Sequence, residues 1–375
     1  MGKCLQWLAL ASFISTTTYA AQPAKLKIDR VMRSAIGKKQ IPGGEVLIMH
    51  RGSIIYHKAF GNLMVKPKRI KAQKNSLYDL ASLTKLFTAT LIMRLHDQGI
   101  IDINKPVATY LESFDTHDKK DITIGQLLTH RSGLPAGIPV EDFTNGLEDA
   151  VEKIAETPLA STPDTQFLYS DLGPIVAGYL AEQATDKSLA ELFREYIFTP
   201  LGLKKTGIRP SAHFLQKIAA YDFDKGTLVH GRVHDPRAFA LGGCAGNAGI
   251  FSTASDVAIF GQLFLNNGRY QGKRLLSTTS IKAMTTPDDS QPKEEQRGVG
   301  FDINTKYSLP RGKLFAKNSF GHTGFTGTSL WIDPSTQTVV VILTNRLHPD
   351  GKGDVKKLRS TIGTLAAQLV QKEIS

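Results

Sequence analysis

The stretch ASLTKLFTATLIMRL, residues 81–95, decides the fold. Its apolar positions recur at three- and four-residue spacing, which predicts a buried helix that ends near Gly99. Ser82 and Lys85 then lie one turn apart on the same face of its first turn. Because a serine hydroxyl needs a neighbouring base to become a nucleophile, this spacing indicates an activated serine. Taken alone, the pair is also compatible with a capping serine and a solvated lysine.

Two further motifs follow in order, Tyr169-Ser170-Asp171 and His322-Thr323-Gly324. With Ser82 to Lys85 they resemble the Ser-x-x-Lys, Tyr-x-Asn and Lys-Thr-Gly triplet of class C β-lactamases and of the related low-molecular-weight penicillin-binding proteins and esterases. The resemblance extends from about Ile41 to Arg346. Within that family, His234-Asp235-Pro236 and the stretch 321–328 are most similar to the penicillin-binding protein 4B branch.

The resemblance implies a role for each matching residue. Lys85 is the natural base for Ser82, and Tyr169 would share the proton transfer and pass the proton to the leaving group. The backbone N–H groups of Ser82 and Phe325 would bind the oxyanion. The remaining candidates would contact the substrate: Asp171, His322, Thr323, Gly324 and Arg346.

Two positions depart from the family pattern. Asp171 stands where Asn is commonest; a carboxylate could pair with Lys85 and raise its pKa, which leaves the division of labour between Lys85 and Tyr169 open. His322 replaces the usual Lys, and an imidazole with its ordinary pKa of about 6.5 is mostly neutral near pH 7, so recognition of a substrate carboxylate should weaken. Arg346 could restore a cationic site, or it is an exposed arginine at a strand end.

The chain-wide pattern predicts an α/β fold of the α+β type. A hairpin is expected around Arg51-Gly52, and strand signals return at 298–303, 328–332 and 339–343. Helices at both ends should flank this antiparallel sheet, as in the β-lactamase/transpeptidase-like fold. We expect one α/β lobe from residues 21–81 and 290–375 and a mainly helical lobe from 82–289, with the site at their seam.

The first 20 residues carry Lys3, an apolar stretch and small residues before Ala21, which predicts a Sec-type signal peptide cleaved near Ala20. The hydrolase domain would then be residues 21–375, periplasmic or secreted, with no membrane anchor. Cys244 would be its only cysteine, so no intrachain disulfide is expected. The net charge of +12 suits an anionic cell envelope, and nucleic acid is a poor candidate partner for an exported chain.

No cofactor is expected. His230, His234 and Asp235 invite a zinc hypothesis, but Gly231 and Pro236 argue against the helix that such spacing needs. The leading hypothesis is a metal-independent serine hydrolase that acylates Ser82, a D,D-carboxypeptidase acting on peptidoglycan peptides, with β-lactams as possible ligands. The alternatives are a carboxylesterase acting on small esters or amides and a penicillin- or muropeptide-binding protein with little turnover.

Overall fold

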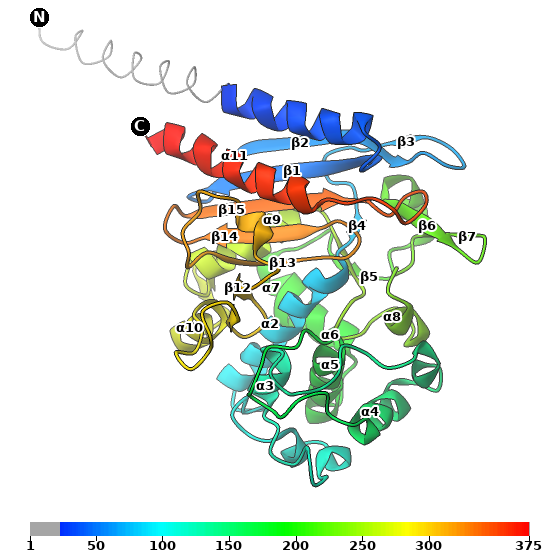
Figure 1. Ribbon diagram of the computed structural model, residues 1–375, viewed down its shortest axis with the longest axis vertical. Coiled ribbons are helices and arrows are strands. Elements are labelled where there is room, and N and C mark those ends of the chain that lie inside the picture. Colours follow the sequence, from blue (N-terminus) through cyan, green and yellow to red (C-terminus); the bar gives the residue numbers. More distant parts are fainter. Residues whose placement is uncertain (1–22, 375) are drawn as a thin grey trace, which may run out of the picture.

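The computed structural model describes residues 23–374, so the predicted signal peptide at 1–20 lies outside the described residues. An eight-stranded sheet forms the upper part of the molecule (Figure 1), and every neighbouring pair in it is antiparallel. In spatial order its strands are β11 (Gln296–Arg297), β12 (Asp302–Asn304), β13 (Phe320–Thr323), β14 (Ser329–Asp333), β15 (Thr338–Thr344), β1 (Gly43–His50), β2 (Ser53–Met64) and β3 (Ile70–Lys71).

The central strand β15 is buried on both faces. Val339 and Val341 pack into the core on the inner face of the sheet, whereas Val340 and Ile342 pack into the core on the outer face. Because successive side chains of a strand point to opposite faces, a strand covered on both sides is a continuous apolar run. The outer core holds the helix formed by residues 23–37 and the C-terminal helix α11 (Lys356–Ile374), as the sequence predicted.

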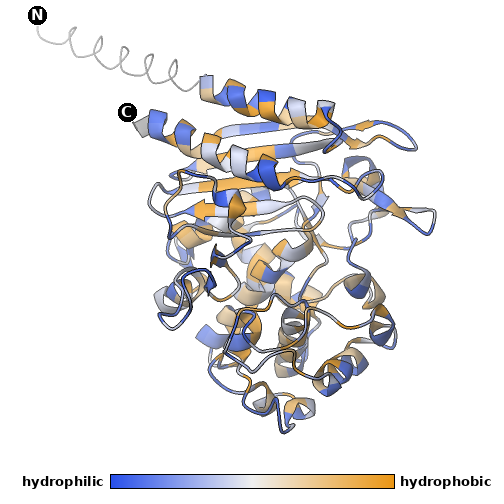
Figure 2. Ribbon diagram, viewed as in Figure 1, coloured by the Kyte–Doolittle hydropathy of each residue, from blue (hydrophilic) through white to orange (hydrophobic). Residues whose placement is uncertain are grey.

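These two terminal helices lie side by side on the outer face of the sheet (Figure 1). Figure 2 shows apolar and polar residues alternating along both of them, as expected for helices with one buried face. The opposite face of the sheet is covered by α9 (Ala254–Leu265). A Cβ at Gly261 of α9 would meet Val339 Cγ1 at 2.8 Å, so glycine permits this close approach. Helix α9 therefore packs on the sheet, although it belongs to the stretch 82–289 that we expected to form the mainly helical lobe. The boundaries of the two lobes remain a prediction.

The remaining helices lie below the sheet in Figure 1. They are α2 (Thr84–Asp97), α3 (Ile124–Leu128), α4 (Leu147–Glu156), α5 (Leu172–Thr185), α6 (Leu189–Phe193), α7 (Thr199–Leu201), α8 (Pro236–Ala240) and α10 (Thr278–Thr285). Short strands complete the chain: β4 (Tyr78–Asp79), β8 (Ile250–Ser252) and β5 (Gly207–Ile208) form one sheet, β6 (Ala220–Asp224) pairs with β7 (Thr227–His230), and β9 (Arg269–Tyr270) pairs with β10 (Lys273–Arg274).

One predicted strand is displaced. The sequence placed a strand at 298–303, but the strand β12 begins only at Asp302. Gly298 lies so close to the end of α10 that a Cβ there would meet Met284 O at 2.0 Å, and Gly300 has a φ of +85°. These glycines form a tight packed turn instead of a strand.

No helix among residues 23–374 has the length and apolar character that crossing a membrane requires.

Candidate active site

The predicted nucleophile follows a strained turn. Strand β4 leads into a short 3₁₀ helix, Ala81–Leu83, which continues as α2. Ala81 has a φ of +48°, a left-handed conformation that is unfavourable for a residue with a Cβ. Its N–H donates to Asp79 Oδ1 at 2.8 Å. Ser82 is therefore held at the start of a buried helix, in the first turn, as the periodicity predicted.

Lys85 lies in the next turn and is only 3% exposed. Its Nζ donates to Ser82 Oγ at 3.0 Å, to Asp171 Oδ1 at 2.7 Å and to the backbone oxygen of Asn247 at 3.3 Å. The three donors of the ammonium group are thus all used. The lysine joins the first motif to the second, and both to the glycine-rich loop that contains Asn247.

The electrostatics favour a charged Lys85. Burial alone would lower its pKa, but the carboxylate of Asp171 and the hydroxyl of Tyr169 outweigh burial and raise the pKa of Lys85 above its ordinary value. Arg237 lies on the other side of Asp171, with Nη1 3.9 Å from Oδ2. Near neutral pH Lys85 therefore donates a hydrogen bond to Ser82 Oγ and cannot accept the proton of the hydroxyl.

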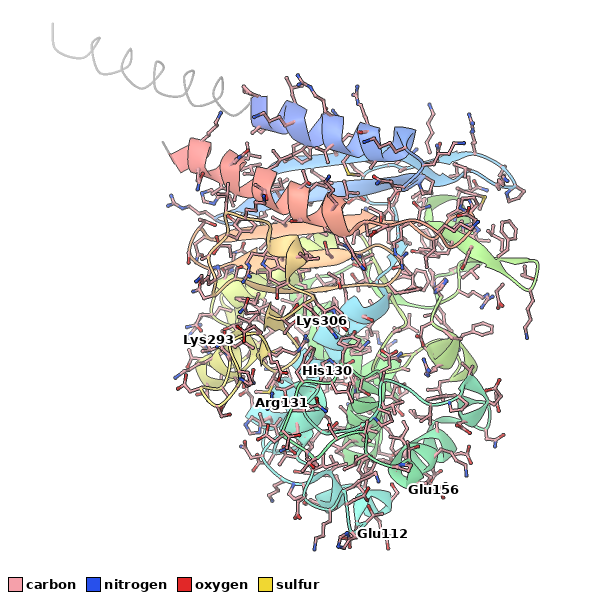
Figure 3. All side chains as sticks on the ribbon, in the orientation of Figure 1. Glu112, His130, Arg131, Glu156, Lys293 and Lys306 are labelled. Atoms are coloured by element: carbon pink, nitrogen blue, oxygen red, sulfur yellow. The ribbon has the colours of Figure 1, made fainter. Side chains whose placement is uncertain are left out.

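Tyr169 lies between the first and third motifs. The centre of its ring is 5.2 Å from Lys85 Nζ and 5.9 Å from the centre of the His322 ring. The residue after it is fixed by His130, which is labelled in the middle of Figure 3 and whose Nδ1 accepts the N–H of Ser170 at 3.2 Å. Ser170 Oγ in turn donates to Pro135 O at 2.6 Å. The phenol is therefore presented by a rigid backbone.

His322 lies on β13 and is 4% exposed. Burial, followed by the charges of Arg297 and Lys85, lowers its pKa well below the ordinary value, so the imidazole is neutral. Its Nδ1 lies 2.8 Å from Thr323 O. Because a carbonyl oxygen only accepts, Nδ1 carries the proton and Nε2 is left as an acceptor. The third motif thus supplies no cation at this position.

Gly324 allows the third motif to approach the nucleophile. A Cβ at this position would meet Thr328 Oγ1 at 2.0 Å and Leu80 O at 2.4 Å. Thr328 Oγ1 donates to Leu80 O at 2.8 Å, which ties this loop to the turn before Ser82. The next N–H, that of Phe325, has no hydrogen-bond partner among residues 23–374. This N–H is accordingly available to a ligand beside Ser82.

A cavity of about 480 Å³ opens over these groups. Asp171 and Lys85 lie behind Ser82 and are not part of the wall of this cavity. Arg346 borders the cavity, but its Nε donates to Phe325 O and its Nη1 to Gly353 O, both at 2.6 Å, so it also holds the loop after β13. The wall contains Ser82, Tyr169, Arg297, Asp302, Tyr307, His322, Thr323, Gly324, Phe325, Arg346 and Arg359, together with residues 353–356.

Several residues near the site were not singled out from the sequence. Asp79 and Asn247 act on the site through backbone partners, and a sequence pattern does not show such contacts. Arg297 and Asp302 form a fully buried pair, with Nη1 3.9 Å from Oδ1, in the wall of the cavity. The only feature of the sequence that marks these two residues is that their charges flank the segment 298–301, which has the pattern of an apolar strand.

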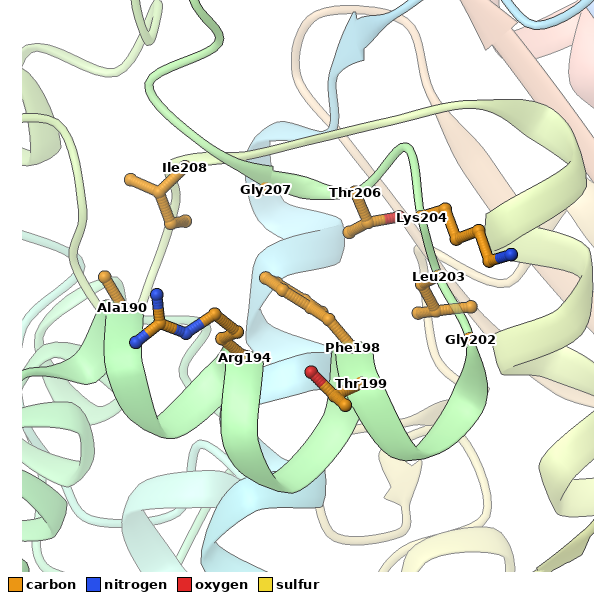
Figure 4. Close-up of a pocket in the computed structure, with 10 residues that line it drawn as sticks. All are labelled: Ala190, Arg194, Phe198, Thr199, Gly202, Leu203, Lys204, Thr206, Gly207 and Ile208. Carbon is orange, nitrogen blue, oxygen red and sulfur yellow. The ribbon is translucent and has the colours of Figure 1, made fainter.

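Another cavity, of about 490 Å³, lies away from the three motifs (Figure 4). Figure 4 shows Phe198, Leu203 and Ile208 in its wall with Arg194, and none of its ten lining residues is a predicted site residue. Among residues 23–374 no group of three or more His, Cys, Asp or Glu side chains is placed to hold a metal ion.

Comparisons with known proteins match this geometry. A family model described as "Beta-lactamase" matches residues 28–361. A protein of Escherichia coli O157:H7 named "Putative D-alanyl-D-alanine carboxypeptidase" is 31% identical over 347 residues, which cover 82% of this chain and 79% of that protein.

Two solved structures share the fold. The structure titled "EstCE1, a hydrolase with promiscuous acyltransferase activity" has a TM-score of 0.74 at 22% identity, over 95% of this chain and 100% of that one. A class C β-lactamase has a TM-score of 0.74 at 18% identity, over 94% and 98% of the two chains. The predicted β-lactamase/transpeptidase-like fold is confirmed.

Proposed function

Because this chain belongs to the beta-lactamase family and is a serine hydrolase, we propose that it forms an acyl-enzyme at Ser82 and cleaves D-amino-acid peptides of peptidoglycan, as a D,D-carboxypeptidase does. The observation that carries this proposal is the position of Lys85 Nζ, 3.0 Å from Ser82 Oγ and 2.7 Å from Asp171 Oδ1, directly behind the serine that lines the cavity. The name of the relative from E. coli supports the same class of substrate.

In the proposed acylation, Ser82 Oγ attacks the scissile carbonyl, and its proton passes to the oxygen of Tyr169 while the phenol's own proton moves to the leaving amine. Since Lys85 is charged, its role is to orient Ser82 Oγ and to stabilise negative charge that develops on the phenol oxygen. The N–H groups of Ser82 and Phe325 bind the oxyanion. This relay through Tyr169 protonates the leaving amine, and the bond between the carbonyl carbon and that amine breaks.

In deacylation, water is the nucleophile and Ser82 Oγ is the leaving group. The water oxygen attacks the acyl ester, a proton of the water passes to the oxygen of Tyr169, and the phenol's own proton moves to Ser82 Oγ as the ester bond breaks. Thr323 and Gly324 would contact the bound substrate at the end of β13, which has no partner strand on the β12 side beyond Gly321 and can pair with an extended peptide. Asp171, which is not part of the cavity wall, would act through Lys85. β-Lactams, which are acyl donors of the same kind, are possible ligands.

A carboxylesterase is the second candidate, because the neutral His322 provides no cation for a substrate carboxylate. Export to the periplasm or the medium, with cleavage near Ala20, is also proposed, on the sequence of residues 1–20 alone.

The test uses the purified protein, its Ser82→Ala variant and Ser255→Ala as a matched serine control outside the cavity. Each is incubated with a fluorescent penicillin, a short-chain chromogenic ester and a D-Ala-D-Ala peptide, while intact mass and product release are followed together. Ser82-dependent release from the peptide supports the carboxypeptidase, and release from the ester alone supports the esterase. A Ser82-dependent adduct without release indicates a penicillin-binding protein. The absence of both an adduct and product release with all three probes would refute the acyl-enzyme.

A further inference from the structure

Asp79 is a fully buried carboxylate three residues before Ser82, and both of its oxygens bind backbone N–H groups. Oδ1 accepts the N–H of Ala81 at 2.8 Å, and Oδ2 accepts the N–H of His234 at 2.7 Å. One side chain thus joins the turn that presents Ser82 to the loop that begins with His234-Asp235-Pro236.

The first bond fixes the nucleophile's backbone. Ala81 is in the left-handed region, which costs about 1–2 kcal/mol for a residue other than glycine and persists only where surrounding contacts impose it. The bond to Asp79 Oδ1 is such a contact. Since the peptide that follows Ala81 carries the N–H of Ser82, the direction of this proposed oxyanion donor depends on the same bond.

The second bond leads to Lys85 by a chain of contacts. Asp235 Oδ1 accepts Ala238 N–H at 2.8 Å, which caps α8, and also accepts Asn247 Nδ2 at 3.2 Å. The backbone oxygen of Asn247 is the third acceptor of the Lys85 ammonium group. The His-Asp-Pro motif therefore connects Asp79 to the partner of the catalytic lysine.

The loop after β13 binds the same turn from the other side. Thr326 Oγ1 donates to the backbone oxygen of Asp79 at 2.8 Å, directly after Phe325, the second proposed oxyanion donor. The ring of Phe325 lies 5.8 Å from the ring of His234. Asp79 N–H in turn donates to Tyr221 Oη at 2.8 Å, so the residue is held from every side.

We propose that Asp79 is a positioning residue that, with the His-Asp-Pro loop, sets the relative placement of the Ser82 and Phe325 N–H groups for the oxyanion. The proposal rests on the proposed acyl transfer at Ser82. It assigns a role to the His-Asp-Pro motif, none of whose residues lines the cavity. The expected consequence is a change in the rate of acylation, since misplaced donors weaken binding of the transition state more than binding of the substrate.

The titration of Asp79 is consistent with this role. Burial raises the pKa of Asp79 to about 6, although the N–H groups of His234 and Ala81 hold it down. The other ionisable groups that face it are the imidazole of His234, the carboxyl of Asp235 and the phenol of Tyr221. Near pH 7 the carboxylate is charged and both oxygens accept; a proton would remove one acceptor.

The test variant is Asp79→Asn, which keeps the shape but replaces one accepting oxygen by an NH₂ group. We expect the acylation rate with the fluorescent penicillin to fall about 100-fold, as for a displacement of reacting groups by about 1 Å, while the dissociation constant of the non-covalent complex changes less than about twofold. Asp256→Asn is the matched control, because Asp256 is also buried and accepts the N–H of Lys205 at 2.8 Å, but on α9. It should lower stability without lowering the acylation rate.

Thr326→Val is the second variant, for the case that Asp79→Asn does not fold. It removes only the hydrogen bond to Asp79 O. It should likewise lower the acylation rate with little change in the dissociation constant of the non-covalent complex. Full acylation rates in both variants, or a loss matched by Asp256→Asn, would overturn the positioning role while leaving acyl transfer intact. A wild-type protein that reacts with none of the probes would instead refute the proposed function, and the positioning role with it.

Discussion

Replacing Asp171 by asparagine tests the electrostatic arrangement around Lys85. The variant removes a negative charge 2.7 Å from Lys85 Nζ but keeps an oxygen that can accept a hydrogen bond. Two unit charges about 4 Å apart attract by about 4 kcal/mol at an effective dielectric constant of about 20. Breaking a buried pair costs about 3–5 kcal/mol, and we expect about 3 kcal/mol because an acceptor remains. The side chain of Asp171 is 23% exposed, which also favours the lower value.

The sign of the effect with pH follows from the raised pKa of Lys85. A lysine whose folded pKa is raised contributes stability that is fully present below its ordinary pKa and is lost as the pH rises through the raised value. The whole loss should therefore be visible at pH 7. In the variant, burial becomes the dominant influence and lowers the pKa of Lys85, so a neutral lysine able to act as a base for Ser82 is populated at lower pH.

Two measurements check these expectations. Urea unfolding at pH 7 should give a lower midpoint with an unchanged slope, and the acylation rate of the variant should begin to rise at a lower pH than that of the wild type. Asp164→Asn is the control, since Asp164 pairs with Arg131 at 2.8 Å but is 59% exposed, and its loss should cost less than about 1 kcal/mol. An unfolding midpoint and a pH profile identical to those of the wild type would show that Asp171 does not govern Lys85.

Other substitutions give separate expectations. Tyr169→Phe should lower the acylation rate by about 10²–10⁴-fold with little change in substrate affinity, measured by rapid mixing; an unchanged rate would exclude Tyr169 as the proton carrier. His322→Lys should lower the KM for benzylpenicillin relative to a neutral ester, because it adds a cation to the cavity wall, and an equal effect on both probes would contradict this. Gly246→Ala should destabilise the fold by at least about 1–3 kcal/mol in urea unfolding, since its Cβ would lie 1.8 Å from Pro174 O, whereas Gly207→Ala meets nothing within 4 Å and should be tolerated.

Much of the fold could be predicted from periodicity. The run from Val339 to Leu343 is apolar at every position, as required of a strand buried on both faces, and the spacing in the terminal segments indicated helices with one apolar side. The segment around Gly298 could not be predicted in the same way. Its apolar residues resemble a strand, but a contact with Met284 O imposes a turn, and such a contact depends on tertiary structure.

The site shows the same limit. The three motifs identified Ser82, Tyr169 and His322 as groups to be brought together, and the structure places them around one cavity. The sequence also allowed a contact between Asp171 and Lys85 that the structure contains. Asp79 and Asn247 could not be found because their hydrogen bonds involve backbone atoms of distant segments. The direction of a backbone N–H or C=O group cannot be predicted from residue types alone.

The pairing of β1 with β15 has a consequence for biosynthesis. Gly44 is opposite Thr344 in the central ladder, so β1 can pair with β15 only after 300 further residues have been made. Contacts of such long sequence separation form late. The hydroxyls of Thr326 and Thr328, which secure the turn before Ser82, belong to the same late segment. A nascent or truncated chain that ends before this segment therefore carries its serine without the hydrogen bonds that fix the turn before it, and we expect hydrolytic competence only after residues 326–344 have been made.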